Sequence, residues 1–223
     1  MFLLDWLSWL VSFLIDAQNI IFVLMFMLFC TTIISLARGL RYFLARRESR
    51  TFIRETADAF RQCQVHEVLF LAHRKRHSHV AAVVASGLEQ FESVSHLVTQ
   101  AEAVAMARRA LHRSSAATHR ALKEGLPTLA AVATTAPLVG LLGTVDGILS
   151  AFGGSAMQKS TLMRLIMGRL SQSLVTTALG LSVAVLAVWA YNYFSSQLEA
   201  FAIETSNASS DLVTFLTVRH RRP

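Results

Sequence analysis

The stretch "TTAPLVGLLGTVDGILSAFGG", Thr134 to Gly154, combines small and apolar residues with one charged residue, Asp146. No other charge occurs between Gly125 and Gln158, a length sufficient for a helix that crosses a membrane. A carboxylate in hydrocarbon costs roughly 2.5 to 3.5 kcal/mol on insertion scales, so an acid inside a span is by default a functional hypothesis. The stretch therefore predicts a membrane helix in which the presence of Asp146 has to be explained.

Two further segments lack charges for long enough to cross a bilayer, residues 17–37 and 170–198. We therefore expect an all-α membrane protein with three transmembrane helices, at 17–38, 127–154 and 165–195. The basic stretch "RGLRYFLARRESR" directly follows the first span, which by the positive-inside rule places it in the cytoplasm. The N-terminus is then outside and the C-terminus inside.

This topology assigns the remaining segments. Residues 1–16 have polar positions in one narrow stripe and tryptophans suited to the headgroup level, which predicts an interfacial amphipathic helix. Residues 39–126 have the composition of a cytoplasmic helical domain. Residues 155–164 are expected to form an outer turn, and residues 196–223 a cytoplasmic tail.

The composition excludes several classes of function. The chain has 223 residues, of which 53% are hydrophobic, and a formal net charge of +7. Its cations are not interleaved with stacking aromatics, so nucleic-acid binding is disfavoured. The run "HRKRHSH", His73 to His79, contains cations but no cysteine or carboxylate, and we interpret it as a solvated cytoplasmic face rather than a metal site. No nucleotide or catalytic motif is present, so neither an enzyme nor a cofactor is expected.

Small residues and mid-span polar residues mark the second and third spans. Small side chains let helices approach closely in lipid, where no hydrophobic force brings them together. The expected packing residues are Pro137, Gly140, Gly143, Gly147 and Gly180. Packing does not explain the polar set Thr144, Gln172, Thr176 and Thr177, together with Ser173.

The segments "LPTLAAVATTAPLVGLLGTVDGILSAF" and "LSQSLVTTALGLSVAVLAVWAYN" resemble the two core helices of the TolQ/ExbB/MotA proton-channel family, closest to the TolQ and ExbB branch. The resemblance implies a homopentamer in the bacterial inner membrane, surrounding single-span partners of the ExbD/TolR type that carry a membrane aspartate. It further implies that proton flow through the complex drives mechanical work. By the same resemblance, Thr144 and Thr177 match channel-lining threonines, and Thr176 is a neighbouring candidate by position. Gln172 is expected to face the pore as well, so the expected pore-lining residues are Thr144, Gln172, Thr176 and Thr177.

Two positions depart from the family pattern. Members of the TolQ and ExbB branch typically carry a glutamate where this chain has Gln172, which can form hydrogen bonds but cannot exchange a proton at accessible pH. A non-conducting ring that acts as a scaffold is therefore the alternative function. Asp146 stands where the family commonly has a bulky residue.

Three roles stay open for Asp146: a relocated proton carrier, a structural or interfacial acid, and a binding group. Arg169 lies three residues before Gln172, on roughly the same helical face. It is expected either to reach toward Asp146 or to extend outward with Arg164.

Overall fold

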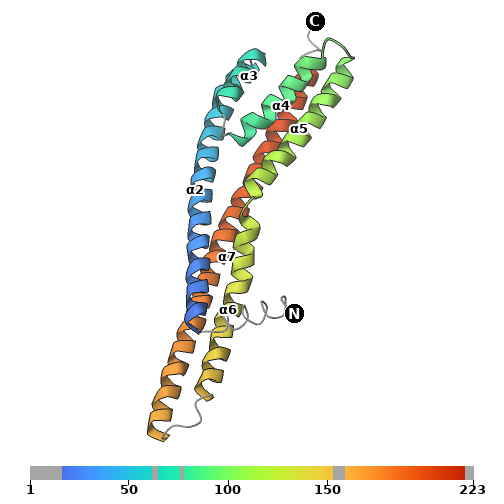
Figure 1. Ribbon diagram of the computed structural model, residues 1–223. Coiled ribbons are helices and arrows are strands. Elements are labelled where there is room, and N and C mark those ends of the chain that lie inside the picture. The colour runs from blue at the N-terminus through green and yellow to red at the C-terminus, as the bar shows by residue number, and fades with distance from the viewer. Residues whose placement is uncertain (1–16, 62–64, 76–77, 153–158, 219–223) are drawn as a thin grey trace. The chain divides into compact units, whose positions relative to one another are not determined.

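The computed structural model describes residues 17–61, 65–75, 78–152 and 159–218, and within these ranges the chain forms helices and no strand (Figure 1). The helices are α2 (Ala17–Arg61), α3 (Val65–Arg74), α4 (His79–Val94), α5 (Gln100–Lys123), α6 (Leu126–Phe152) and α7 (Lys159–Val218). The interfacial helix expected at 1–16 lies outside the described residues. Residues 159–164, expected in the outer turn, belong to the start of α7.

The chain divides into two units that share its two longest helices. Unit 1 comprises residues 1–36 and 125–193, and unit 2 comprises residues 37–124 and 194–223. α2 and α7, of 45 and 60 residues, each run through both units without interruption. The first and third expected spans are therefore parts of longer helices. The backbone stays helical past residue 38 in α2 and past residue 195 in α7.

Three segments are long and apolar enough to cross a membrane, within residues 19–56, 100–151 and 166–217. They comprise the apolar part of α2, the chain from α5 into α6, and most of α7. α5 and α6 are separate helices, because the chain turns at Gly125, where φ is 78°. This left-handed conformation is readily adopted by glycine, which has no Cβ.

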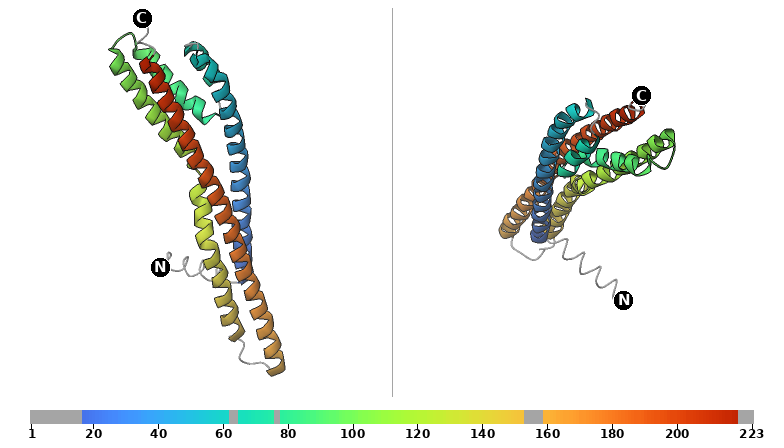
Figure 2. Two further views of the ribbon diagram at one scale, coloured as in Figure 1. Left: turned by 180° about the vertical axis from the view of Figure 1, so that it is seen from behind. Right: turned by 90° about the horizontal axis from the view of Figure 1, so that it is seen from above.

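Unit 1 contains the contact between α6 and α7, whose ribbons run side by side in the left view of Figure 2. Its core consists of small and β-branched residues: Val132, Ala136, Val183, Ala184 and Ala187, with Met27 and Leu28 of α2 packed against them. Small side chains at such positions bring helix backbones into van der Waals contact, which is the main source of helix association in lipid.

Unit 2 has a core of the kind found in water-soluble helical domains. Larger aliphatic and aromatic side chains from α2, α3, α4, α5 and the end of α7 meet there, among them Phe52, Val68, Leu88, Leu111 and Leu212. Leu88 and Leu212 have no exposed surface. Large aliphatic and aromatic side chains in a common core favour a folded unit held by burial of apolar area.

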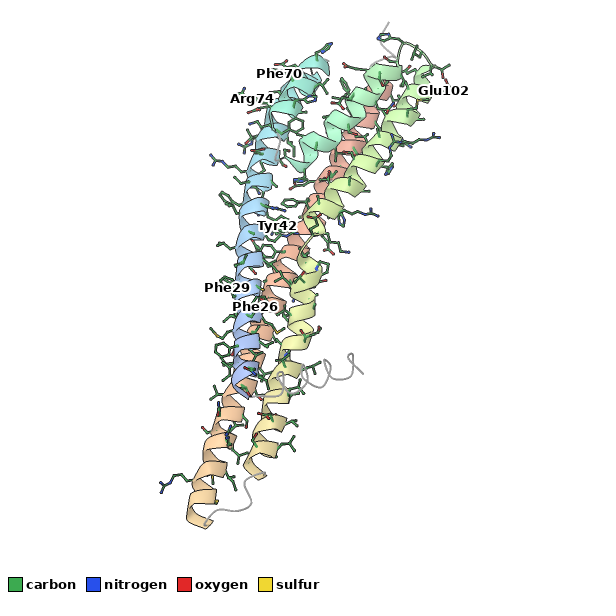
Figure 3. The ribbon with its side chains drawn as sticks, in the orientation of Figure 1. Phe26, Phe29, Tyr42, Phe70, Arg74 and Glu102 are labelled. Carbon is green, nitrogen blue, oxygen red and sulfur yellow. The ribbon has the colours of Figure 1, made fainter. Side chains whose placement is uncertain are left out.

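Two hydrogen bonds join α2 to the end of α5 within unit 2, near Tyr42, which is labelled in Figure 3. Arg38 is only 5% exposed, and its guanidinium donates to the carbonyl oxygen of Leu122. The Tyr42 hydroxyl donates to the same oxygen at 2.8 Å. The last carbonyls of a helix lack partners within the helix, so these two donors satisfy a group that the break at Gly125 leaves open.

Candidate functional site

The contact between α6 and α7 is a seam of glycines facing small polar side chains. A Cβ built at Gly140 would lie 3.2 Å from the Thr177 Cα, and one built at Gly180 would lie 2.7 Å from the Ala136 carbonyl oxygen. Cβ atoms at Gly143 and Gly147 would meet the side chains of Thr176 and Ser173. Pro137 lies in the same stretch of α6 and is partly buried. We call this contact the glycine seam.

The two threonines of α7 occupy different environments at the seam. Thr176 is fully buried, and its hydroxyl donates to the Ser173 carbonyl oxygen at 2.7 Å. Thr177 is partly buried, and its hydroxyl donates across the seam to the Gly140 carbonyl oxygen at 3.0 Å. Thr177 therefore links the two helices, whereas Thr176 satisfies its hydroxyl within α7.

The polar residues beside the seam fall on two sides. On α6, Thr144 follows Gly143 and Asp146 precedes Gly147, so a turn of about 100° per residue puts them on opposite sides of the seam. On α7, Thr177 and Gln172 are separated in the same way. The helices are antiparallel, and the pairing of Gly140 with Thr177 and of Gly143 with Thr176 fixes which sides correspond.

The geometry groups Thr144 with Thr177 on one side and Asp146 with Gln172 on the other. We call these the hydroxyl side and the acid side. The Thr144 hydroxyl donates to the Leu141 carbonyl oxygen at 2.7 Å, which leaves the oxygen lone pairs free to accept a hydrogen bond. The Gln172 side chain is exposed, as expected of a group available to water or to another chain.

Asp146 is 9% exposed, and among the described side chains none forms a hydrogen bond or an ion pair with it. Arg169 and Arg164 are both exposed. The pairing of Gly147 with Ser173 places Arg169 about one helical turn nearer the start of α7 than Asp146.

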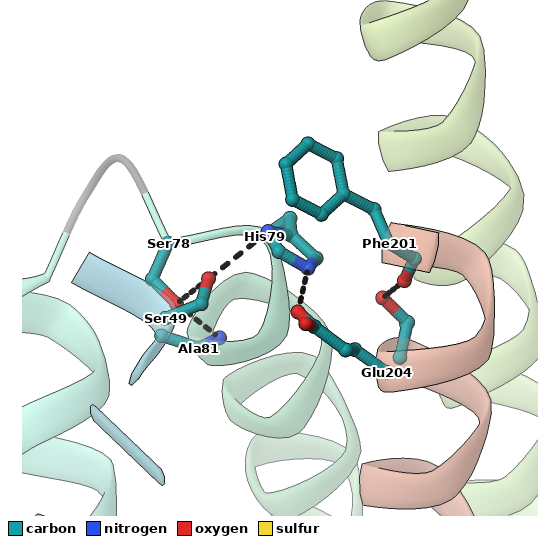
Figure 4. A network of polar contacts seen from close by, with 7 residues as sticks. Ser49, Ser78, His79, Ala81, Phe201 and Glu204 are labelled. Carbon is teal, nitrogen blue, oxygen red and sulfur yellow. Dashed lines mark hydrogen bonds and ion pairs between the residues drawn. The ribbon is translucent and has the colours of Figure 1, made fainter. Parts of the chain in front are cut away.

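A second polar cluster lies in unit 2, at a place where the sequence pattern predicted none (Figure 4). His79 is 4% exposed and Ser78 is 1% exposed, so the interpretation of this part of "HRKRHSH" as a solvated face is wrong. The buried serine on the facing helix, Ser49, provided no sequence signal because it lies in a strongly basic run. His73, by contrast, is exposed and lies 3.0 Å from Glu89.

One direction of hydrogen bonding satisfies every hydroxyl of this cluster. The Ala81 N–H donates to Ser78 Oγ, Ser78 can donate to Ser49 Oγ at 3.0 Å, and Ser49 can donate to His79 Nδ1 at 3.0 Å. The proton of a neutral ring is then on Nε2, which lies 3.3 Å from Glu204 Oε2 but makes no well-aligned hydrogen bond. No group of three or more potential metal ligands exists in the described part of the chain.

Burial lowers the pKa of His79 from 6.5 to about 4, so the ring is neutral at pH 7. The unfolded state then binds more protons than the folded state between these two values, and stability falls as pH falls. We expect acidification from pH 7.5 to 5 to cost up to about 2 kcal/mol, less whatever attraction Glu204 supplies to the protonated ring. The measurement is the thermal unfolding midpoint of the detergent-solubilised protein at the two pH values.

The matched variants for this prediction are His79→Asn, which can keep a hydrogen bond to Ser49, and His119→Asn at an exposed position. The pH dependence should shrink in His79→Asn and persist in His119→Asn. Equal pH dependence in wild type and His79→Asn would contradict the assignment.

The three apolar helices and the glycine seam with its polar sides define a class: a multi-pass α-helical membrane protein with a polar site inside a tightly packed helix pair. The chain belongs to the MotA/TolQ/ExbB proton channel family, whose model matches residues 75–206. The matched range contains α4, α5, α6 and the part of α7 up to residue 206, which includes all of the glycine seam.

Characterised relatives are similar over part of their length. The biopolymer transport protein ExbB of Pseudomonas putida is 36% identical over 107 residues, covering 48% of this chain and 32% of the relative. The Tol-Pal system protein TolQ of Pseudomonas aeruginosa is 47% identical over 79 residues, 35% of this chain and 34% of the relative. ExbB of Xanthomonas campestris pv. campestris is 35% identical over 113 residues, covering 51% of this chain and 45% of the relative. The match thus spans less than half of each of these relatives.

Proposed function

We propose that the chain is a proton-channel subunit of a bacterial inner-membrane motor and converts the proton gradient into mechanical work. It works with a single-span partner of the ExbD/TolR type that carries a membrane aspartate, in a homopentamer that surrounds that partner. The N-terminus lies outside, and unit 2 lies on the cytoplasmic side of the membrane. The observation that carries the proposal is the set of polar side chains flanking the glycine seam within an otherwise uncharged part of α6 and α7.

The hydroxyl side is the better candidate for the channel wall. Thr144 and Thr177 present hydroxyl groups that can hydrate and orient a proton-carrying aspartate of the partner. On the acid side, the Gln172 amide can form hydrogen bonds with water or with a partner side chain, but it does not exchange a proton. Thr176 is fully buried, so its contribution is to the packing of the seam rather than to a surface.

Asp146 is best explained as a structural or interfacial acid. It is separated from Thr144 by about 200° of helix rotation, so it does not share the hydroxyl side. An intramembrane carboxylate without a partner among the described residues is costly, and a group of a neighbouring subunit can offset that cost. Asp146 and Arg169 would then act in assembly, with Arg169 near the outer surface.

The scaffold function is the alternative that Gln172 favours, because glutamine stands where the family typically has a titratable glutamate. In that case the same ring assembles and holds a partner without conducting protons.

Proton uptake separates the two functions. We expect vesicles that contain the chain with its partner to acidify internally under an imposed membrane potential, as followed by an enclosed pH-sensitive dye. Vesicles with the chain alone should acidify at least fivefold more slowly. An intact complex with no uptake above empty vesicles would eliminate the channel and leave the scaffold.

A further inference from the structure

An exposed stripe of apolar side chains runs along α2. Its members succeed one another at alternating spacings of four and three residues, which keeps them on one face of a helix. They are Phe22, Phe26, Phe29, Ile33, Leu36, Leu40 and Phe43, and each is between 49% and 75% exposed. Figure 3 labels Phe26 and Phe29 on this helix. The described part of the chain therefore leaves this face of α2 uncovered.

The same spacing continues with three arginines. After Phe43 the stripe positions are Arg47, Arg50 and Arg54, and all three are exposed. Together with Arg46, Phe43 and Thr51 they line an open cavity of about 400 Å³. We call this cavity the arginine pocket. The stripe thus changes from purely apolar to purely cationic within one helical turn.

The charge of the arginine pocket is not paired within the described residues. No ion pair joins any of its four guanidinium groups to a carboxylate there. Glu55, which is close in sequence, faces Lys75 instead, with 3.6 Å between the Lys75 ammonium and the carboxylate. Four guanidinium groups around one cavity favour an anionic occupant, and guanidinium groups bind phosphate oxygens through paired hydrogen bonds.

The length of the apolar stripe matches the thickness of the hydrocarbon core of a bilayer. Phe22 and Phe43 are 21 helical steps apart, which at about 1.5 Å per step is roughly 32 Å. The hydrocarbon core of a bilayer is about 30 Å thick. If Phe22 lies at one edge of the hydrocarbon, the opposite edge falls just after Phe43, and the arginine pocket lies at the depth of the lipid phosphates.

Two charged residues precede Phe43, and neither contradicts a hydrocarbon edge just after Phe43. Arg38 is buried and bound to the Leu122 carbonyl oxygen, so it does not face lipid. Arg41 is exposed but lies off the stripe, and its long side chain can extend toward the headgroups.

We propose that the arginine pocket binds the phosphate headgroup of an anionic glycerophospholipid in the leaflet next to unit 2. Arg47, Arg50 and Arg54 hold the phosphate, Arg46 adds positive charge at the rim, and Phe43 contacts the start of the acyl chains. The ligand is a membrane lipid rather than a soluble phosphate, because the pocket continues directly from a stripe of hydrocarbon length. The proposal does not depend on proton conduction.

The test is retention of lipid by the purified full-length protein. The protein is mixed in mild detergent with equal amounts of phosphatidylglycerol and phosphatidylcholine, and bound lipid is counted by native mass spectrometry. We expect wild type to retain phosphatidylglycerol at least fivefold over phosphatidylcholine. We expect the triple variant Arg47→Gln, Arg50→Gln, Arg54→Gln to lose most of that preference.

A matched control removes the same charge elsewhere. Arg109→Gln, Arg113→Gln, Arg120→Gln changes three exposed arginines of α5 and should leave lipid retention unchanged. Equal loss in both triple variants would overturn the proposal, since the effect would then come from net charge alone. Displacement of the lipid by inorganic phosphate at low millimolar concentration would also overturn it, in favour of a soluble anion site.

Folding of the variants is checked by far-ultraviolet circular dichroism. If the pocket variant fails to fold, the wild-type measurement still decides the matter, because equal retention of the two lipids would refute the proposal without any variant.

Discussion

Gly180→Val should leave little correctly assembled protein. A Cβ at Gly180 would lie 2.7 Å from the Ala136 carbonyl oxygen and 2.9 Å from the Gly140 Cα. Both are backbone atoms, so no side chain can rotate away and the two helices must separate. We expect a cost of roughly 3 kcal/mol, at the upper end of the usual range for overpacked cores. The measurement is the thermal unfolding midpoint in mild detergent, together with the mass of the assembled complex.

Gly168→Val is the matched control for this prediction. Gly168 lies in the same helix, α7, and a Cβ there would meet no atom within 4 Å. We expect its unfolding midpoint and assembled mass to equal those of wild type. If both valine variants behave alike, then the close contact at the glycine seam does not determine stability.

Thr177→Val should reduce partner-dependent proton uptake at least tenfold, and more than Asp146→Asn does. Valine keeps the shape of threonine but cannot donate to the Gly140 carbonyl oxygen or offer a hydroxyl on the hydroxyl side. Asparagine at 146 keeps size and hydrogen bonding and loses only ionisation. The two variants therefore test the two sides of the seam separately, with uptake measured in vesicles that contain the chain and its partner.

Two controls make this comparison interpretable. Thr177→Ser retains the hydroxyl and should retain most of the uptake. Thr135→Val removes a hydroxyl of α6 that bonds only to the Ala131 carbonyl oxygen of its own helix, and it should have little effect. Should Asp146→Asn abolish uptake in an intact complex while Thr177→Val leaves it unchanged, Asp146 would be the proton carrier and the hydroxyl side would have no role in conduction.

The fold class could be predicted from sequence because it depends on uncharged length, which is visible residue by residue. Three apolar helices and the absence of strands in the described residues agree with that prediction. The ends of the helices could not be predicted in the same way. Charge reports where a helix leaves hydrocarbon, whereas a helix ends where its backbone stops being helical, and α2 and α7 remain helical far beyond their apolar parts.

The site was only partly accessible to sequence reasoning. Glycine spacing indicated a close helix contact, but the relative rotation of two helices needs the contacts of Gly140 and Gly143 with α7. Those contacts place Thr177 on the side of Thr144 and Gln172 on the side of Asp146, whereas the sequence had grouped Gln172 with the threonines. Burial of His79 depends on Ser49 and Phe201, residues distant in the chain, whose hydroxyl and ring meet it only in the fold.

The uninterrupted course of α7 makes the number of residues within it a constraint of its own. Ser173 must face Gly147 of α6, and Gly180 must face the backbone of α6 at Ala136. Each residue added to a helix rotates all later residues by about 100°. One inserted or deleted residue between these two positions would put one of them out of phase, and α7 contains no loop that could absorb the change. The spacing from Ser173 to Gly180 is thus fixed even where the exposed side chains between them can vary.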